Sequence, residues 1–305
     1  MVSLAANDQR RSRLGEGERA PAGLRRAARG QLEMSIERLE GDTDEDLGTA
    51  VHETRKGLKR LRAAVRLGRD ELGEEAYRHE NGAFRDAGRR LGGARDGRVL
   101  LETFDALADR YPDEAPPERF EGFKRTLVGQ GGAAQRRLHE RAAIDEVLGE
   151  LRRACARVGD WPLERKGLET LAGLGAHVPR RPPRVPQRPS GAEHREPARA
   201  ARRVKCLWYA AQIVRSAAPK KMKRTARRAH ELSNLIGEDH DLALLAERTD
   251  ERHDRFAEGT TAGELAALTE RRRAELRREA LDLGQRLFRK KPRKVARPLE
   301  KSGAA

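Results

Sequence analysis

The stretch VHETRKGLKRLRAAVR, residues 51–66, carries the strongest pattern in the chain. Read as an α-helix, it places basic side chains at steps of three or four residues, which stacks them along one face. These side chains are His52, Arg55, Lys56, Lys59, Arg62 and Arg66. The opposite side carries Val51, Leu58, Leu61 and Val65. The stretch therefore predicts a helix whose apolar face is buried and whose cationic face is available to an anion.

The composition of the 305-residue chain favours long amphipathic helices. Apolar residues make up 37% and charged residues another 37%, whereas aromatic residues are only 4%. Ala, Leu, Arg and Glu dominate, which is typical of thin helical cores and not of sheets. The sequence contains no convincing run of alternating apolar residues that would predict a strand, so the expected fold class is all-α.

The formal net charge of +16 predicts a polyanionic partner. Nucleic acid, an acidic membrane face and a phosphate polymer all satisfy that condition. The chain has no long apolar run and its N-terminus lacks the apolar core of a secretory signal, so we expect no contact with a membrane and a cytoplasmic location. Cys155 and Cys206 are the only cysteines, too few for a disulfide framework and too isolated for a thiolate metal site.

Glycine and proline divide the chain into helical segments. The expected helices cover residues 24–39, the opening stretch as far as 72, 74–91, 96–110, 117–158 with an interruption near 129–132, 198–216, 220–236, 239–256 and 263–288. Residues 178–197, VPRRPPRVPQRPSGAEHREP, are rich in proline and arginine and predict an exposed linker. Residues 1–19 and 289–305 predict flexible basic ends.

The two sides of the linker resemble each other, which predicts an internal duplication. The matched positions are Lys59 with Lys205, Leu61 with Leu207, Gly92 with Gly237, and Asp96 with Asp241. Each half thus contains a basic helix, a second helix, a glycine break, and an aspartate at the start of the next helix. We expect one domain over residues 20–300, made of two similar halves at about 20–177 and 198–300, packed about a pseudo-two-fold axis.

At these positions the sequence resembles the CHAD family, the conserved histidine α-helical domain. The spacing H-x-x-R-x-x-x-[RK]-R-L-R is matched by His52, Arg55, Lys59, Arg60, Leu61 and Arg62, and LGxxRD by Leu91, Gly92, Arg95 and Asp96. The second half matches at Arg202, Val204, Lys205, Leu207 and Tyr209, then at Gly237 and Asp241. The resemblance implies two four-helix bundles with a basic central cavity that binds inorganic polyphosphate. Ala198, Ala201 and Trp208 stand where the family usually has a His and two Arg, so we expect the first half to contribute most of the binding.

A phosphate polymer carries repeated charges and no bases, so its binder needs many cationic donors on a rigid frame. We therefore expect a binding protein and not an enzyme, with no cofactor and no metal. The expected polyphosphate contacts are His52, Arg55, Lys56, Lys59, Arg62, Arg66, Arg202, Lys205, Lys223, Arg227, Arg25 and Arg29.

Asp96 and Asp241 are expected to be structural anchors, because a carboxylate at a helix start accepts backbone N–H bonds. Polyphosphate granules and polyphosphate-metabolising enzymes are the expected cellular partners.

Three alternatives stay open. His240-Asp241 resembles the His-Asp pair of HD-type metal-dependent phosphohydrolases, with His230 one predicted helix earlier, although such a site needs further ligands. A nucleic-acid-binding helical protein also fits the charge, but the basic rows lack the interleaved aromatic residues on which bases stack. Finally, a run of charges is often only a solvated helix face, and His52 could simply pack inside the bundle.

Overall fold

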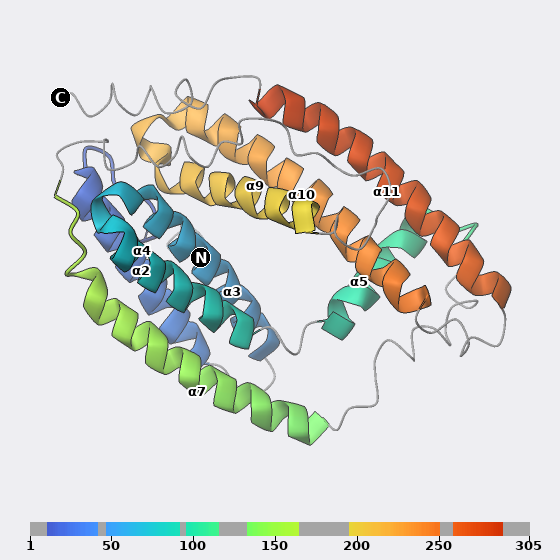
Figure 1. Ribbon diagram of the computed structural model, residues 1–305, viewed down its shortest axis with the longest axis horizontal. Helices are drawn as coiled ribbons and strands as arrows, with labels where there is room; N and C mark the ends of the chain where they lie inside the picture. Colours follow the sequence, from blue (N-terminus) through green and yellow to red (C-terminus); the bar gives the residue numbers. More distant parts are fainter. Residues whose placement is uncertain are drawn as a thin grey trace, which may run out of the picture.

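The computed structural model describes residues 11–41, 47–91, 96–115, 133–164, 195–250 and 259–288, and in these ranges all regular structure is helical. The expected all-α fold is thereby confirmed. The helices are α2 (Ala20–Gly41), α3 (Leu47–Leu67), α4 (Arg69–Arg90), α5 (Asp96–Arg110), α7 (Ala133–Val158), α9 (Arg195–Ile213), α10 (Pro219–Asp250) and α11 (Gly259–Phe288), with a 3₁₀ turn, η3 (Arg215–Ala217), between α9 and α10 (Figure 1). In this part of the chain no helix has both the length and the apolar content needed to cross a membrane.

The described helices pack in two groups of four (Figure 1). One group contains α2, α3, α4 and α7, and the other contains α5, α9, α10 and α11. α3 packs on α9 and so connects the two groups. Although α5 precedes α7 in the sequence, it packs against α10 and α11, so the spatial grouping does not follow the division at the linker. The internal duplication itself stays a prediction.

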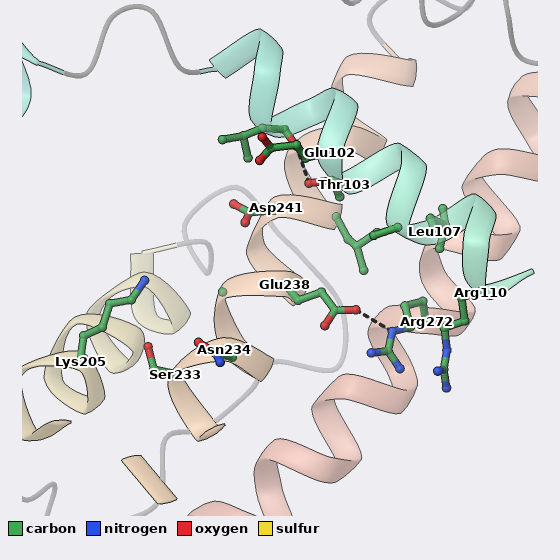
Figure 2. Close-up of a pocket in the computed structure, with 14 residues that line it drawn as sticks. Glu102, Thr103, Leu107, Arg110, Lys205, Ser233, Asn234, Glu238, Asp241 and Arg272 are labelled. Atoms are coloured by element: carbon green, nitrogen blue, oxygen red, sulfur yellow. Dashed lines mark hydrogen bonds and ion pairs between the residues drawn. The ribbon is translucent and has the colours of Figure 1, made fainter. Parts of the chain in front are cut away.

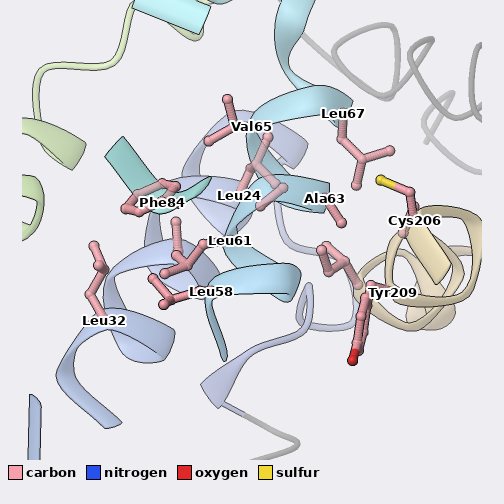
Figure 3. Close-up of a cluster of buried hydrophobic side chains, with 14 of the residues drawn as sticks. Leu24, Leu32, Leu58, Leu61, Ala63, Val65, Leu67, Phe84, Cys206 and Tyr209 are labelled. Atoms are coloured by element: carbon pink, nitrogen blue, oxygen red, sulfur yellow. The ribbon is translucent and has the colours of Figure 1, made fainter. Parts of the chain in front are cut away.

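The largest buried cluster surrounds α3 (Figure 3). Leu58 and Leu61 of α3 are buried together with Phe84 of α4 and with leucines of α2. Ala63 and Leu67 lie on the side of α3 that faces α9. Burying a leucine of this kind contributes about 1.5–3 kcal/mol to folding. The predicted apolar face of the opening helix is therefore confirmed, and its burial holds the cationic face in a defined direction.

The junction between α3 and α4 differs from the prediction. The helix that carries the cationic face ends at Leu67 and not near residue 72, because the chain turns at Gly68. A Cβ atom at Gly68 would lie 3.1 Å from side-chain carbons of Leu163 and of Leu24, so the turn fits closely against the core. Gly73 still interrupts the next helix, with φ 77° and ψ 163°, values that glycine adopts without the steric cost other residues incur.

The predicted break at Gly237 is wrong. α10 runs without interruption from Pro219 to Asp250, and Gly237 lies inside it. A helical glycine costs only about 1 kcal/mol relative to alanine, and the buried residues on both sides of it outweigh that cost. Asp241 therefore lies in a helix interior, so its expected place at a helix start is also wrong. Asp239 instead fastens α10 to α11, because its Oδ1 accepts hydrogen bonds from Arg273 and Arg277, each at 3.1 Å.

The ends of the predicted linker and of the N-terminal tail are ordered parts of the fold. α9 already begins at Arg195, and Pro197 lies in its first turn, where a missing N–H costs no hydrogen bond. Residues 11–19, here called the N-terminal segment, pack against α2, where a Cβ atom at Gly23 would lie 2.5 Å from Leu14. Leu14 is 5% exposed and belongs to the main core cluster. Residues 1–10, 165–194 and 289–305 lie outside the described residues.

Glu275 fastens α11 to the end of α5. Its carboxylate accepts hydrogen bonds from Arg272 at 3.0 Å, from Arg110 at 2.9 Å and from the Tyr111 hydroxyl at 3.1 Å. Burial raises the pKa of Glu275, but these donors outweigh it and lower the pKa from 4.5 to about 2. A carboxylate whose pKa is lower in the folded state stabilises the fold above its unfolded value and loses that contribution as the pH falls from 4.5 toward 2.

We therefore expect Glu275→Gln to lower the thermal unfolding temperature at pH 7, and to lower it progressively less below pH 4.5. The measurement is thermal unfolding by circular dichroism of wild type and variant at a series of pH values. Glu279→Gln, an exposed change one turn further along α11, serves as the control. A Glu275→Gln difference that is independent of pH would contradict this assignment.

Candidate anion-binding site

Most of the basic side chains of α3 form a row on the side of the helix that faces α4 and α9. Five of them follow one another at steps of three, four, three and four residues, which places them on one face. This α3 stripe consists of His52, Arg55, Lys59, Arg62 and Arg66, and each member is half-buried. From the first to the last member the stripe extends about 21 Å along the helix axis, at 1.5 Å per residue. The predicted cationic face is thus present in the structure, and the helical backbone of α3 fixes the spacing of its side chains.

Neighbouring helices hold the arginines of the α3 stripe in place. Arg55 Nη1 donates to the Leu91 carbonyl at the end of α4 (3.2 Å), Arg62 Nε donates to Asn81 Oδ1 on α4 (3.1 Å), and Arg66 Nη1 donates to Cys206 Sγ on α9 (3.1 Å). These acceptors are a carbonyl, an amide and a sulfur, none of which is a carboxylate. These three contacts orient the guanidinium groups and are made to neutral acceptors.

The electrostatics of the α3 stripe favour an anion. Burial lowers the pKa of Arg62, and the charges of Arg66 and Arg85 lower it further. Burial also raises the pKa of the Cys206 thiol, so the sulfur that Arg66 contacts is neutral at pH 7. Partly desolvated like charges repel one another, and an anion bound among them would remove that repulsion.

Comparison with known protein families bears on what the α3 stripe is for. The family model of the CHAD domain matches residues 26–250. The chain belongs to the CHAD domain family. The match contains the α3 stripe, all of α9 and all of α10, so the resemblance seen in the sequence motifs is confirmed. A comparison with curated proteins finds no match.

Two predicted residues of α2 point away from the α3 stripe. Arg25 Nη2 donates to the carbonyls of Trp161 and Leu163, at 2.6 Å and 2.9 Å, and so holds the chain that follows α7. Arg29 also turns toward α7, where its Nη2 would lie 3.1 Å from a Cβ atom at Gly159. These two arginines support the packing of α2 on α7, a role that the sequence did not suggest.

Lys56 lies on the row next to the α3 stripe, and its charge is balanced. Its Nζ forms an ion pair with Glu53 Oε1 at 2.6 Å, between residues one helical turn apart. Glu53 consequently has a lowered pKa: burial raises it, but the hydrogen bond and charge of Lys56 outweigh that effect. Lys56 is therefore less available to a ligand than the members of the stripe.

In the second half of the CHAD region, Lys205 lines a pocket of about 410 Å³ between α5, α9, α10 and α11 (Figure 2). The charged residues of the lining are three acids, Glu102, Glu238 and Asp241, and three bases, Lys205, Arg110 and Arg272. Arg272 and Glu238 form an ion pair at 2.7 Å. This pocket is thus mixed in charge, and the basic central cavity implied by the family stays a prediction.

The other predicted residues of the second half follow α10 toward the same pocket. Lys223 and Arg227 are exposed and share one face of α10 with His230 and with Asn234, which lines the pocket. Partial burial and the charge of Lys205 lower the pKa of His230. Arg202 is exposed on α9. The second half therefore offers a more open and less concentrated set of cations than the α3 stripe.

The histidines of the hydrolase alternative do not converge. His230 and His240 lie on the unbroken helix α10, ten residues apart, and so are separated by about 15 Å along its axis. Ligands of one metal ion need to meet within about 2 Å of it. In the part of the chain that the structure describes, no group of three or more His, Cys, Asp or Glu side chains is arranged to hold a metal ion.

Proposed function

We propose that this CHAD protein binds inorganic polyphosphate through the α3 stripe and does not hydrolyse it. The observation that carries the proposal is the row of five half-buried basic residues on one face of α3, in which Arg62 and Arg66 are oriented by an amide and a thiol. Arginine forks bind pairs of phosphate oxygens, and charge-assisted hydrogen bonds contribute about 1.5–3 kcal/mol each. The stripe is long enough to contact several successive phosphates, so the summed energy can offset the entropy lost by a flexible polymer.

The main rival is nucleic acid, which the net charge would also attract. Single-stranded nucleic acid binds to surfaces where aromatic side chains stack with the bases. The helix that carries the stripe, α3, contains no Phe, Tyr or Trp. A ligand that consists of phosphates alone therefore suits the stripe better than one whose bases need contacts.

A competition experiment tests the proposal. Labelled long-chain polyphosphate is bound to the full chain and challenged with duplex DNA, RNA and orthophosphate at equal phosphate concentration, while phosphate release is assayed with added magnesium or manganese. We expect unlabelled polyphosphate to compete best and no phosphate to be released. Stronger competition by RNA or DNA would favour a nucleic-acid binder, and metal-dependent release would favour a hydrolase.

His52 makes the binding dependent on pH. Bound polyanion favours the imidazolium form, so we expect the affinity for long-chain polyphosphate to increase as the pH falls through the histidine range near about 6.5. The matched measurement uses His52→Ala, in which the slope of log affinity against pH should become flatter between about pH 8 and pH 5.5. Equal slopes in wild type and variant would show that His52 only packs in the bundle.

Polymer binding also suggests where the chain would act. We expect such a protein to accumulate at polyphosphate granules or to associate with enzymes that make or consume the polymer. Fluorescence microscopy of the tagged chain, with and without the α3 stripe arginines, would test that expectation. Loss of granule localisation in the stripe variant would support it, whereas localisation that does not depend on the stripe would contradict it.

A further inference from the structure

The N-terminal segment brings Arg13 to one end of α9. The backbone N–H of Leu14 donates to the Ile213 carbonyl at 2.9 Å, and the Ser216 hydroxyl donates to the Leu14 carbonyl at 2.8 Å. Arg13 and Arg215 are the sequence neighbours of these bonded residues. Their backbones are therefore held close together, although 202 positions separate Leu14 and Ser216 in the sequence.

Arg60 reaches the same end of α9 from α3. Its guanidinium carbon lies 5.9 Å from the centre of the Tyr209 ring, and its Nη1 donates to Gln31 Oε1 at 3.3 Å. Tyr209 precedes Ile213, whose carbonyl holds the N-terminal segment, by one turn of the same helix. Three arginines from distant parts of the sequence thus lie near this end of α9, and we call Arg13, Arg60 and Arg215 the arginine cluster.

The surroundings of the arginine cluster favour an anion. Burial lowers the pKa of Arg13, and the charges of Arg215 and Arg60 lower it further, so these cations lie near enough to repel one another. Burial raises the pKa of Tyr209 to about 12, which keeps its hydroxyl protonated and able to donate a hydrogen bond at neutral pH. The charge of Glu53 also raises the pKa of Tyr209, and the Glu53 carboxylate forms an ion pair with Lys56.

The other arginines near the N-terminal segment show a different arrangement. Arg11 forms ion pairs with Glu33 and Glu37, each at 3.2 Å. Arg26 forms an ion pair with Glu18 at 2.7 Å. Arg11 and Arg26 thus engage Glu33, Glu37 and Glu18 outside the arginine cluster.

The arginine cluster is separate from the α3 stripe. On α3, the buried residue Ala63 lies between Arg60 and Arg66 and faces α9 (Figure 3), so the two arginines reach α9 at different residues, Tyr209 and Cys206. Arg13 also precedes the region matched by the CHAD family, which begins at residue 26. The arginine cluster and the α3 stripe therefore contact α9 at different residues.

We propose that the arginine cluster is a second anion site, which binds a compact phosphate group, either free orthophosphate or the terminal phosphate of a chain. Planar guanidinium groups grip phosphate oxygens in pairs, and the Tyr209 hydroxyl supplies one more donor. A terminal phosphate has more free oxygens and more charge than an internal one, so it suits a site where donors come from three directions. This inference goes beyond polymer binding and does not depend on it.

The test uses the full chain with the α3 stripe weakened by Arg55→Gln and Lys59→Gln, so that the second site is observed alone. Calorimetric titrations are made with orthophosphate, with linear tripolyphosphate and with cyclic trimetaphosphate, which has no terminal phosphate. We expect linear tripolyphosphate to bind and the cyclic compound to bind at least tenfold more weakly. Binding of orthophosphate would identify the free ion as a ligand, and its failure to bind beside tripolyphosphate would identify a chain end.

Variants of the arginine cluster complete the test. Adding Arg13→Gln and Arg215→Gln should weaken tripolyphosphate binding at least tenfold, whereas Arg13→Lys should retain part of it. The charge-matched control is Arg11→Gln with Arg78→Gln, since both residues are already paired with glutamates. The proposal is overturned if the stripe-weakened chain does not bind tripolyphosphate, or if the cluster and control variants bind it equally well. Neither result would affect the long-polymer binding expected of the α3 stripe.

Discussion

Replacing Arg55 and Lys59 together by glutamine should weaken binding of long-chain polyphosphate about a hundredfold. Each change removes at least one charge-assisted hydrogen bond, for which about 1.4 kcal/mol, or a factor of ten, is a discounted value. Both residues lie in the half-buried α3 stripe, where surrounding protein limits screening by salt. The measurement is a titration of labelled polymer at fixed ionic strength, accompanied by a thermal unfolding curve to establish that the variant is folded.

The matching change in the second half, Arg202→Gln with Lys205→Gln, should cost less than tenfold. Arg202 is exposed, so its charge is screened by solvent and salt. Lys205 lines a pocket together with Glu102 and Asp241, whose carboxylates repel a polyanion. A second control, Arg78→Gln with Arg152→Gln, removes the same charge from exposed ion pairs outside the proposed site. Equal losses from the two halves would refute the expected asymmetry.

Replacing Gly57 by valine should destabilise the fold by about 2 kcal/mol, because α2 and α3 meet at this glycine without room for a side chain. A Cβ atom there would lie 2.6 Å from Ser35 Oγ and 2.7 Å from Gln31 Nε2. Ser35 cannot turn away without cost, since its hydroxyl donates to the Gln31 carbonyl at 2.9 Å. Chemical denaturation gives the free energy of unfolding that tests this expectation.

Gly82 provides the matched control for Gly57. It also lies in a helix interior, in α4, but a Cβ atom there would have no neighbour within 4 Å. Gly82→Ala should therefore stabilise the protein by up to about 1 kcal/mol, the difference in helix propensity. If Gly57→Val were as harmless as Gly82→Ala, the close packing of α2 on α3 would be incorrect.

The sequence predicted those features that depend on a regular local pattern. The spacing of leucines and basic residues over residues 51–66 was sufficient to orient α3, since a helix converts such spacing directly into faces. The bounds of α5 at Asp96 and Arg110 were also found, because a glycine pair precedes the helix and Tyr111-Pro112 follows it. Both cases required only information from within the segment itself.

Features that depend on contacts between distant segments could not be predicted. Gly68 and Gly237 are both glycines within helical patterns, yet the chain turns at the first, where Leu163 and Leu24 approach closely, and continues as a helix at the second. Arg25 was indistinguishable from a ligand-binding residue until its partner, the Trp161 carbonyl, was placed beside it. The arginine cluster likewise joins residues whose proximity follows from the packing of α3, α9 and the N-terminal segment.

The N-terminal segment also bears on where the protein could be shortened. A chain cut to the residues that match the CHAD family would lack Leu14 and so expose the apolar surface that it covers. The same cut would remove α11, which supplies Leu265, Leu268 and Leu276 to the second buried cluster. The region shared with the family is therefore shorter than the stretch of chain that builds the two buried clusters, and fragments for expression should retain residues 11–288.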